Sequence, residues 1–214
     1  MRSRRCAATA RSRSRLAVAP EPETRPWRLF VAVELPAPLR QALQEPLDGL
    51  AGMRDWIRAS DPAQVHLTLH FLGGVDVARV PSITAALEPA VGRHARFTLS
   101  ARGVNAFGGK RRPRVLWAAF ADTNVDRIRA LRHDTAGALR RAGFEIEPDF
   151  RPHLTLGRAR RLPPGAGREA LERWYAVWKD HEFGPLPVES VHLMRSQLAR
   201  GPARHSRVAS LELQ

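Results

Sequence analysis

Two stretches of this sequence carry the same four residues, His66-Leu67-Thr68-Leu69 and His153-Leu154-Thr155-Leu156. Each stretch lies near the middle of one half of the 214-residue chain. Two chance copies of His-x-Thr with apolar residues at the alternate positions are expected roughly once in several hundred sequences of this composition. The repeat therefore requires a physical reason.

The alternation of polar and apolar residues in both copies is typical of a β-strand. Side chains at positions i and i+2 of a strand share a face, so His66 and Thr68 lie on one face and the two leucines on the other. The same holds for His153 and Thr155. If the two halves are related by a pseudo-twofold axis, the polar faces meet across a cleft and form one site with two imidazoles and two hydroxyls.

Such a site suits phosphoryl chemistry. A neutral imidazole can take a proton from water, and a protonated imidazole can give one to a leaving oxygen. Threonine hydroxyls can donate hydrogen bonds to the non-bridging oxygens of a phosphate and hold the phosphorus between the imidazoles. The residues favour hydrolysis of a phosphodiester without a metal or another cofactor.

Two other interpretations of the repeat stay open. Each His-x-Thr could be a half-exposed polar strand face with no chemical role. Alternatively, both histidines could bind zinc, with His70, His192 or an acidic residue completing the ligand set. A threonine hydroxyl is a weak zinc ligand, however, and it stands where a ligand would be expected. His192 lacks a threonine partner, so we expect it to be structural.

The charge of the chain is strongly positive. Lys and Arg total 35 against 21 Asp and Glu, the formal net charge is +14 and the pI is near 11.6. Lysine occurs only at positions 110 and 179. Arginine binds phosphate through a bidentate fork, so the composition favours RNA or another polyanion as partner. A general arginine bias of the source proteome would give the same charge.

The cysteine content and the hydropathy of the chain indicate in which cellular compartment the protein could reside. Cys6 is the only cysteine, which excludes an intrachain disulfide and fits a reducing cytoplasm. No apolar run reaches membrane-spanning length.

Residues 1–26 contain seven Arg, two Glu and many Ser and Ala. We expect them to be a disordered basic tail, a targeting segment or the result of an early start codon, with one folded domain over 27–214.

Hydrophobic periodicity predicts a mixed α+β fold. Leucines at helical spacing recur in the first helix, which Pro46 bends or shortens, and Pro81 interrupts the second. Gly73-Gly74 is expected to end the strand that carries the first motif. The sequence has no glycine-rich phosphate loop. The predicted strands are 28–35, 55–60, 65–72, 96–108, 114–120, 151–159, 188–198 and 207–213, and the predicted helices are 37–50, 76–92, 123–142 and 167–179.

The segments around the motifs carry a resemblance to a known family. In order and spacing, "RLFVAVELP", "VHLTLHFLG", "PRVLWAAF" and "FRPHLTLGR" resemble the two-histidine phosphoesterase superfamily. Within it they are similar to the RNA 2′,3′-cyclic phosphodiesterases, also called 2′-5′ RNA ligases. The resemblance runs from about Arg28 to about Leu211.

The resemblance implies two pseudo-symmetric lobes, with a concave antiparallel sheet in each and a central cleft between them. It also implies hydrolysis of a terminal RNA 2′,3′-cyclic phosphate to a 2′-phosphomonoester by a monomer. Carried over by motif, His66 is the proton donor to the leaving 3′ oxygen and His153 the proton acceptor. Thr68 and Thr155 bind the phosphate, and Arg158, in H-x-T-x-x-R, contacts phosphate or backbone.

One departure and several alternatives remain. In "SQLARGPARHSRV", His205 stands where many relatives have a tyrosine, so the preferred substrate could differ. The same chemistry run backwards would make the protein a 2′-5′ RNA ligase. A cyclic nucleotide phosphodiesterase acting on small molecules would use the same residues. An RNA-binding module without activity is a further alternative, although both intact motifs argue against it.

Overall fold

The computed structural model describes residues 25–110, 112–121, 123–161, 165–197 and 203–214. Most of the predicted tail, residues 1–24, lies outside the described residues, and the first strand begins at Trp27. The strands are β1 (Trp27–Glu34), β2 (Ile57–Ala59), β3 (His66–Val75), β4 (Phe97–Phe107), β5 (Val115–Phe120), β6 (Leu154–Ala159), β7 (Glu182–Val188), β8 (Ser190–Gln197) and β9 (Arg204–Glu212). The α-helices are α1 (Ala37–Ala42), α2 (Gln44–Ala51), α3 (Val80–Val91), α4 (Val125–Arg141) and α5 (Gly165–Trp178), and η1 (Pro62–Gln64) and η2 (Val77–Arg79) are short 3-10 helices.

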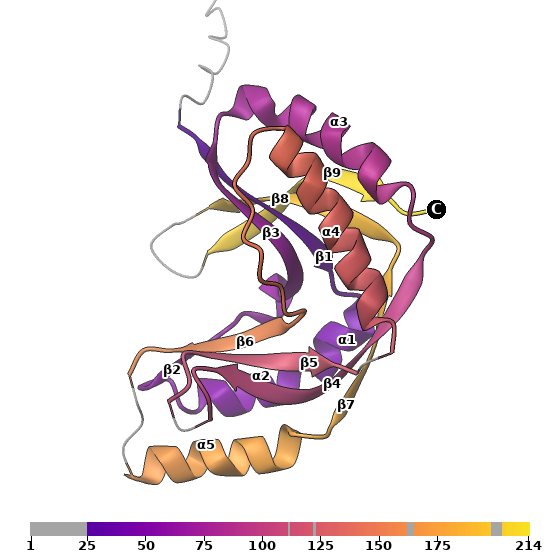
Figure 1. Ribbon diagram of the computed structural model, residues 1–214. Helices are drawn as coiled ribbons and strands as arrows, with labels where there is room; N and C mark the ends of the chain where they lie inside the picture. The colour runs from indigo at the N-terminus through magenta and orange to yellow at the C-terminus, as the bar shows by residue number, and fades with distance from the viewer. Residues whose placement is uncertain (1–24, 111, 122, 162–164, 198–202) are drawn as a thin grey trace, which may run out of the picture.

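The strands form two lobes that share one antiparallel hydrogen-bonded order. That order is β7-β4-β5-β6-β3-β1-β8-β9, with β2 paired to β6 beside it. In Figure 1, the lobe built on β3, β1, β8 and β9 lies above the lobe built on β6, β5, β4 and β7. The predicted α+β class and bilobal architecture are confirmed.

The two lobes exchange their covering helices. Helices α1 and α2 connect β1 to β3 of one lobe, but α2 contacts β2 and β6 and α1 contacts β7 of the other. Helix α4 connects β5 to β6, but it packs on α3 and contacts β3 (Figure 1). Each lobe therefore depends on a connection from its neighbour, which restrains the position of one motif strand relative to the other.

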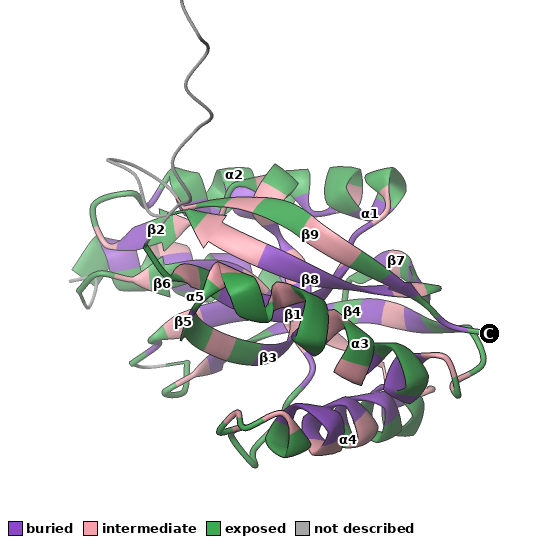
Figure 2. Ribbon diagram, turned by 90° about the horizontal axis from the view of Figure 1, so that it is seen from above, coloured by how far each residue is buried: buried purple, intermediate pink, exposed green. Residues whose placement is uncertain are grey.

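Apolar side chains on the helix-covered faces form the core. The predicted leucines of the first helical segment are buried, as are those of the stripe along α4. Figure 2 shows buried and exposed residues alternating around α4, as expected of an amphipathic helix. The buried predicted residues are Leu39, Leu43, Leu47, Leu50, Val125, Ile128, Leu131, Thr135 and Leu139. None of the described helices is long and apolar enough to cross a membrane.

Proline and glycine account for the differences from the predicted elements. The first helical segment is two helices that meet at Leu43, with Pro46 in the second. Pro81 does not interrupt α3 but lies in its first turn, where a missing N–H costs nothing. β3 continues through Gly73-Gly74 to Val75, and Gly73 has a φ of 72°, which glycine adopts readily.

One strand was not predicted at all. β7 contains Pro185 and Pro187, and proline is rare inside strands because it cannot donate a ladder hydrogen bond. β7 lies at the edge of the sheet and pairs only with β4 in the strand order. An edge strand needs donors on one side alone, which is why these prolines are tolerated.

Candidate active site

The two motif strands meet at the junction of the lobes. Leu67 of β3 and Leu154 of β6 are paired in antiparallel register, and both are completely buried. Their neighbours on either side in the sequence therefore point to the opposite face. His66, Thr68, His153 and Thr155 all line one cavity of about 590 Å³. The structure thus brings together the four motif side chains, the arrangement expected if the two halves are related by a pseudo-twofold axis.

Both imidazoles are held by the same hydrogen bond. His66 Nδ1 lies 2.7 Å from the carbonyl oxygen of Gln64, and His153 Nδ1 lies 2.8 Å from that of Arg151. A carbonyl oxygen only accepts, so each Nδ1 carries the proton and donates it. In the neutral ring, Nε2 is then left with a free lone pair. The bond fixes the tautomer and the orientation of both rings in the same way.

Aromatic side chains pack against both rings. The ring centroids of Phe30 and His66 are 4.8 Å apart, and Phe107 meets His153 edge-on at 5.0 Å. Trp117 adds a second contact to His153 at 5.9 Å. These apolar neighbours limit ring rotation and keep water from one side of each imidazole, so packing supports the orientation that the carbonyl bonds set.

Burial lowers the pKa of both histidines. Desolvation is the main cause for His66, and it lowers the pKa to about 4 although the bond to the Gln64 carbonyl raises it. Desolvation likewise lowers the pKa of His153, followed by the opposing bond to Arg151 and by the charge of Arg158. Both rings are therefore neutral at pH 7 in the free protein. Either one can accept a proton, and a donor must first gain one.

A bulge places Arg158 on the cavity side. Trp117 pairs with Thr155 and Leu116 pairs with Gly157, so Leu156 is an extra residue in β6. Without the bulge, strand alternation would turn position 158 away from Thr155. With it, the exposed Arg158 side chain lines the same cavity as Thr155.

A separate bulge, in β3, turns His70 away from the site. Thr68 pairs with Ala32 and His70 pairs with Val31, which leaves Leu69 as the extra residue of β3. His70 is 3% exposed, and its Nε2 lies 2.8 Å from the hydroxyl of Thr135 on α4. Within the described parts of the chain, no group of three or more His, Cys, Asp or Glu could hold a metal ion. The structure does not bring His70 together with the two motif histidines.

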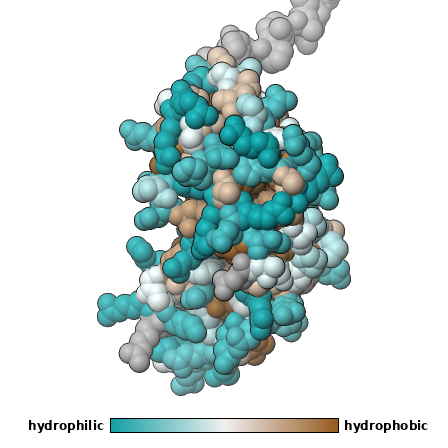
Figure 3. Space-filling view, turned by 45° about the vertical axis from the view of Figure 1, so that its right-hand side comes forward, coloured by the Kyte–Doolittle hydropathy of each residue, from teal (hydrophilic) through white to brown (hydrophobic). Residues whose placement is uncertain are grey.

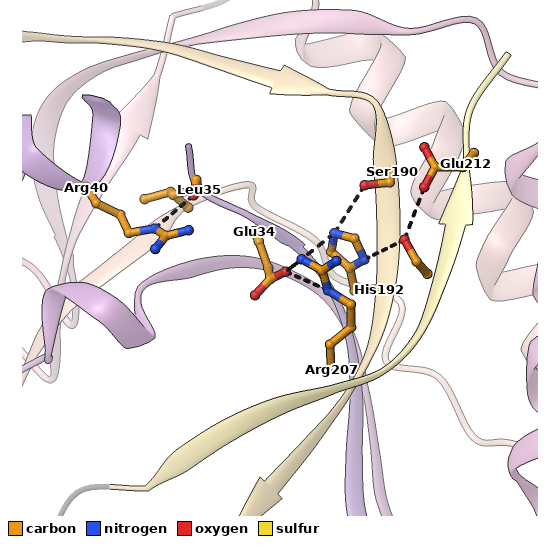
Figure 4. Close-up of polar contacts among 8 residues, drawn as sticks. Glu34, Leu35, Arg40, Ser190, His192, Arg207 and Glu212 are labelled. Atoms are coloured by element: carbon orange, nitrogen blue, oxygen red, sulfur yellow. Dashed lines mark hydrogen bonds and ion pairs between the residues drawn. The ribbon is translucent and has the colours of Figure 1, made fainter. Parts of the chain in front are cut away.

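A polar network extends from β1, the neighbour of the motif strand β3, to β8 and β9. Glu34 pairs in register with His66, and its carboxylate accepts from Arg207 (Figure 4). His192 is buried, with Ser190 Oγ 3.1 Å from Nε2 and Ser210 Oγ 3.1 Å from Nδ1. Burial lowers the pKa of His192. It does not line the cavity, so the network positions Glu34 rather than presenting a third imidazole.

Comparison with known proteins identifies the family. A family model described as the 2′-5′ RNA ligase superfamily matches residues 29–200. The chain belongs to the 2′-5′ RNA ligase superfamily. An RNA 2′,3′-cyclic phosphodiesterase of Archaeoglobus fulgidus is 31% identical over 176 residues, which cover 82% of this chain and 94% of the relative. One of Thermus thermophilus is 34% identical over 82% of this chain and 85% of the relative.

A solved structure shows the same arrangement. The crystal structure of a Thermus thermophilus protein superposes with a TM-score of 0.66 at 29% identity, covering 86% of this chain and 97% of that one. The resemblance that the motif segments carry is confirmed at the level of the family and the fold.

His205, which the sequence analysis singled out as standing where a tyrosine is expected, lines the same cavity as the motif residues. Its ring meets His66 edge-on at 5.2 Å and Phe30 at 5.0 Å. Its backbone N–H donates to Gln64 Oε1 at 2.7 Å. Burial lowers the pKa of His205, so at neutral pH it is an uncharged neighbour of His66. The strand pattern of the sequence could not show this contact, because β1 and β8 lie between β3 and β9 in the strand order.

Phe71 is a cavity residue that the sequence analysis missed. It is 69% exposed, and Phe71 and Val177 are the large apolar side chains exposed among the described residues. On the face drawn in Figure 3, apolar side chains are visible in small groups between hydrophilic ones. Phe71 lies five residues after His66, as Arg158 does after His153, so the two bulges present an aromatic ring in one lobe and a cation in the other.

Proposed function

We propose that this superfamily member hydrolyses the terminal 2′,3′-cyclic phosphate of RNA to a 2′-phosphomonoester. The observation that carries the proposal is the matched pair of imidazoles. Both donate Nδ1–H to a carbonyl two residues upstream, and both line one cavity with two threonines. The named activity of the Archaeoglobus fulgidus and Thermus thermophilus relatives supports the same reaction.

The reaction needs one base and one acid on opposite sides of the phosphorus. His153 Nε2 takes a proton from water as the water oxygen bonds to phosphorus. His66 Nε2 gives a proton to the 3′ oxygen as its bond to phosphorus breaks. The products are a 2′-phosphomonoester and a free 3′-hydroxyl. The resemblance to the family assigns the direction, since the two rings are alike in their hydrogen bonds.

Thr68, Thr155 and Arg158 bind the charge of the phosphate in this proposal. The hydroxyls donate to the non-bridging oxygens and hold the phosphorus in line between the imidazoles. Arg158 follows Thr155 on the cavity side of β6 and offers a guanidinium to the same group. Charge that builds on the phosphate in the transition state strengthens each of these interactions.

The substrate itself helps to protonate the donor. In the free protein, burial holds the pKa of His66 at about 4. A phosphate anion next to the ring favours the charged imidazolium and raises that pKa. The acid therefore forms where an anionic substrate is bound.

The exposed ring of Phe71 favours a substrate whose phosphate is attached to a nucleotide base. An exposed aromatic ring on the wall of a phosphate cavity offers a face for stacking a base, and stacking is tolerant of base identity. The net charge of +14 favours attachment of that nucleotide to a longer polyanion.

The enzyme acts as a monomer in the cytoplasm in this proposal. Both motifs come from one chain, so the cavity is complete without a second copy. The cytoplasm is a reducing environment, which suits the single cysteine, Cys6. It also contains RNA with free termini.

The test uses a short RNA with a 2′,3′-cyclic phosphate end, incubated with the protein and EDTA. We expect a new monoester that maps to the 2′ position. A 3′-phosphate product would contradict the assigned direction. Loss of activity in EDTA with recovery on adding zinc or manganese would contradict metal-free chemistry. A parallel reaction with an acceptor RNA bearing a 5′-hydroxyl would detect 2′-5′ joining.

A further inference from the structure

Two arginines face each other across neighbouring strands at the outer end of β6. Arg58 of β2 is paired in register with Arg158, and both side chains line the main cavity. Like charges directly opposite in a sheet destabilise the pair. Within the described residues, neither guanidinium forms an ion pair with an acidic side chain. Asp61 also lines the cavity, but its carboxylate accepts from the N–H of Ala63.

The local backbone is built to bring these arginines together. The bulge at Leu156 turns Arg158 to the cavity side. A Cβ atom added at Gly157 would lie 3.1 Å from Ile57 Cγ2 and 3.2 Å from the Arg58 carbonyl oxygen. Glycine at this position therefore allows β2 to approach β6 closely. At the equivalent place after the other bulge, His70 packs on α4 instead.

A second hollow adjoins the arginine pair. It has a volume of about 400 Å³ and is lined by Arg58, Arg158, Ala159 and Arg160. Arg58 and Arg158 line both this hollow and the main cavity, so they form the wall between them. In Figure 1, β2 and β6 lie side by side at this end of the sheet.

We propose that the Arg58–Arg158 pair with Arg160 is a second phosphate subsite, which binds the internucleotide phosphate next to the cyclic end, with the several N–H donors of Arg158 shared between this phosphate and the cyclic one. This inference rests on the proposed function and goes beyond it by naming the residues that bind the second phosphate of the RNA. Guanidinium groups bind phosphate through paired N–H donors. A phosphate between Arg58 and Arg158 replaces their repulsion by two attractions, which explains why the unpaired charges face the cavity.

The experiment compares two substrates that differ only in the second phosphate. One is a short RNA with a 2′,3′-cyclic end, and the other is the nucleoside 2′,3′-cyclic monophosphate of the same terminal base. Arg58→Gln should raise KM for the RNA roughly tenfold or more, the scale of a lost charged hydrogen bond. For the mononucleotide, kcat/KM should stay within about twofold of wild type. The salt dependence of RNA binding should weaken by about one contact.

Two variants serve as controls. Arg141→Gln removes the same charge from an exposed residue at the end of α4, outside the cavity, and should leave the kinetics on both substrates and the salt dependence unchanged. Arg58→Lys keeps the charge without the guanidinium fork, so it should restore the salt dependence but only part of the affinity.

Several outcomes would overturn the subsite. An equal loss on both substrates in Arg58→Gln would place Arg58 at the cyclic phosphate or in folding. No loss on either would show that no second phosphate is bound there. If the wild-type protein hydrolyses neither substrate, the proposed function fails, and the subsite is tested by binding alone. Arg58→Gln should then still bind an RNA 2′-phosphate more weakly than wild type does, with no change in affinity for a nucleoside 2′-monophosphate. Equal affinity of Arg58→Gln and wild type for the RNA 2′-phosphate would exclude the subsite.

Discussion

Leu67 and Leu154 pair directly across the junction of the two lobes, and neither has any exposed surface. Each is the second residue of an H-L-T-L motif, so the pair places the two copies side by side on neighbouring strands. The side chains that flank each leucine line the cavity on the opposite face. The packing of two leucines therefore sets the spacing of the two imidazoles.

Leu67→Ala should lower both stability and activity. Removing a fully buried leucine side chain costs about 2–5 kcal/mol in the free energy of unfolding, measured by urea titration. Because the cavity left behind also lets β3 shift, kcat on cyclic-ended RNA should fall as well. Leu99→Ala on β4, also fully buried, is the control and should lose similar stability without a comparable loss of kcat. Equal kcat in the two variants would contradict the role of the junction.

The threonine hydroxyls should matter for rate more than for folding. Thr68→Val and Thr155→Val keep the shape of the side chain but remove the donor, and each should lower kcat by roughly ten- to a hundredfold. Thr→Ser at the same position retains the hydroxyl and should recover most of the rate. A valine variant with wild-type kcat would show that its hydroxyl does not bind the reacting phosphate.

Much of this arrangement can be predicted from the sequence. The alternation in the two motifs predicts which side chains share a face, and the 3.6-residue periodicity predicts the buried stripe of α4. The two polar faces meet because the two strands that carry the repeated motif pair with each other. These features depend on local periodicity and on one repeat, which a single sequence displays directly.

The rest depends on long-range packing. The bulges at Leu69 and Leu156 reverse the facing of His70 and Arg158, and no local pattern marks them. The Arg58–Arg158 pair likewise depends on the register of β2 against β6. β7 was missed for a different reason, since its prolines resemble a loop until its place at the edge of the sheet is known.

Anion binding should raise the pKa of His66. In the free protein burial lowers it to about 4, and a bound anion favours the imidazolium. Binding therefore takes up a proton, and affinity for sulfate should increase as pH falls through the pKa in the complex toward the free value of about 4. NMR titration of the His66 ring with and without sulfate measures this shift. Chloride at equal ionic strength is the control, and an unchanged His66 pKa in sulfate would contradict the account.

Glu34 should support the acid form of His66. Its charge raises the pKa of His66 against the larger effect of burial, and Arg207 holds it in place (Figure 4). Glu34→Gln removes that charge and leaves the positive charge of Arg207, so the His66 pKa should fall. The alkaline limb of the kcat profile should then move to lower pH.

Glu212→Gln is the matched control for Glu34→Gln. Glu212 accepts from Ser210 in the same network, and its charge is not among the causes that shift the His66 pKa. Its pH profile should match wild type. An alkaline limb that stays in place in Glu34→Gln, or moves equally in both variants, would show that Glu34 does not act on His66.

The central claim is that both motifs act on one phosphate, and the rates of His66→Ala, His153→Ala and the double variant test it most directly. Measured on RNA with a 2′,3′-cyclic end, each single variant should lower kcat by roughly a hundredfold or more, the scale of a lost general acid or base. Wild type should show a bell-shaped pH profile whose limbs belong to the pair. The double variant should be little slower than the slower single variant, because residues that act as a unit are not additive. Retention of wild-type activity after removal of either histidine, or full multiplication of the two losses in the double variant, would contradict the account.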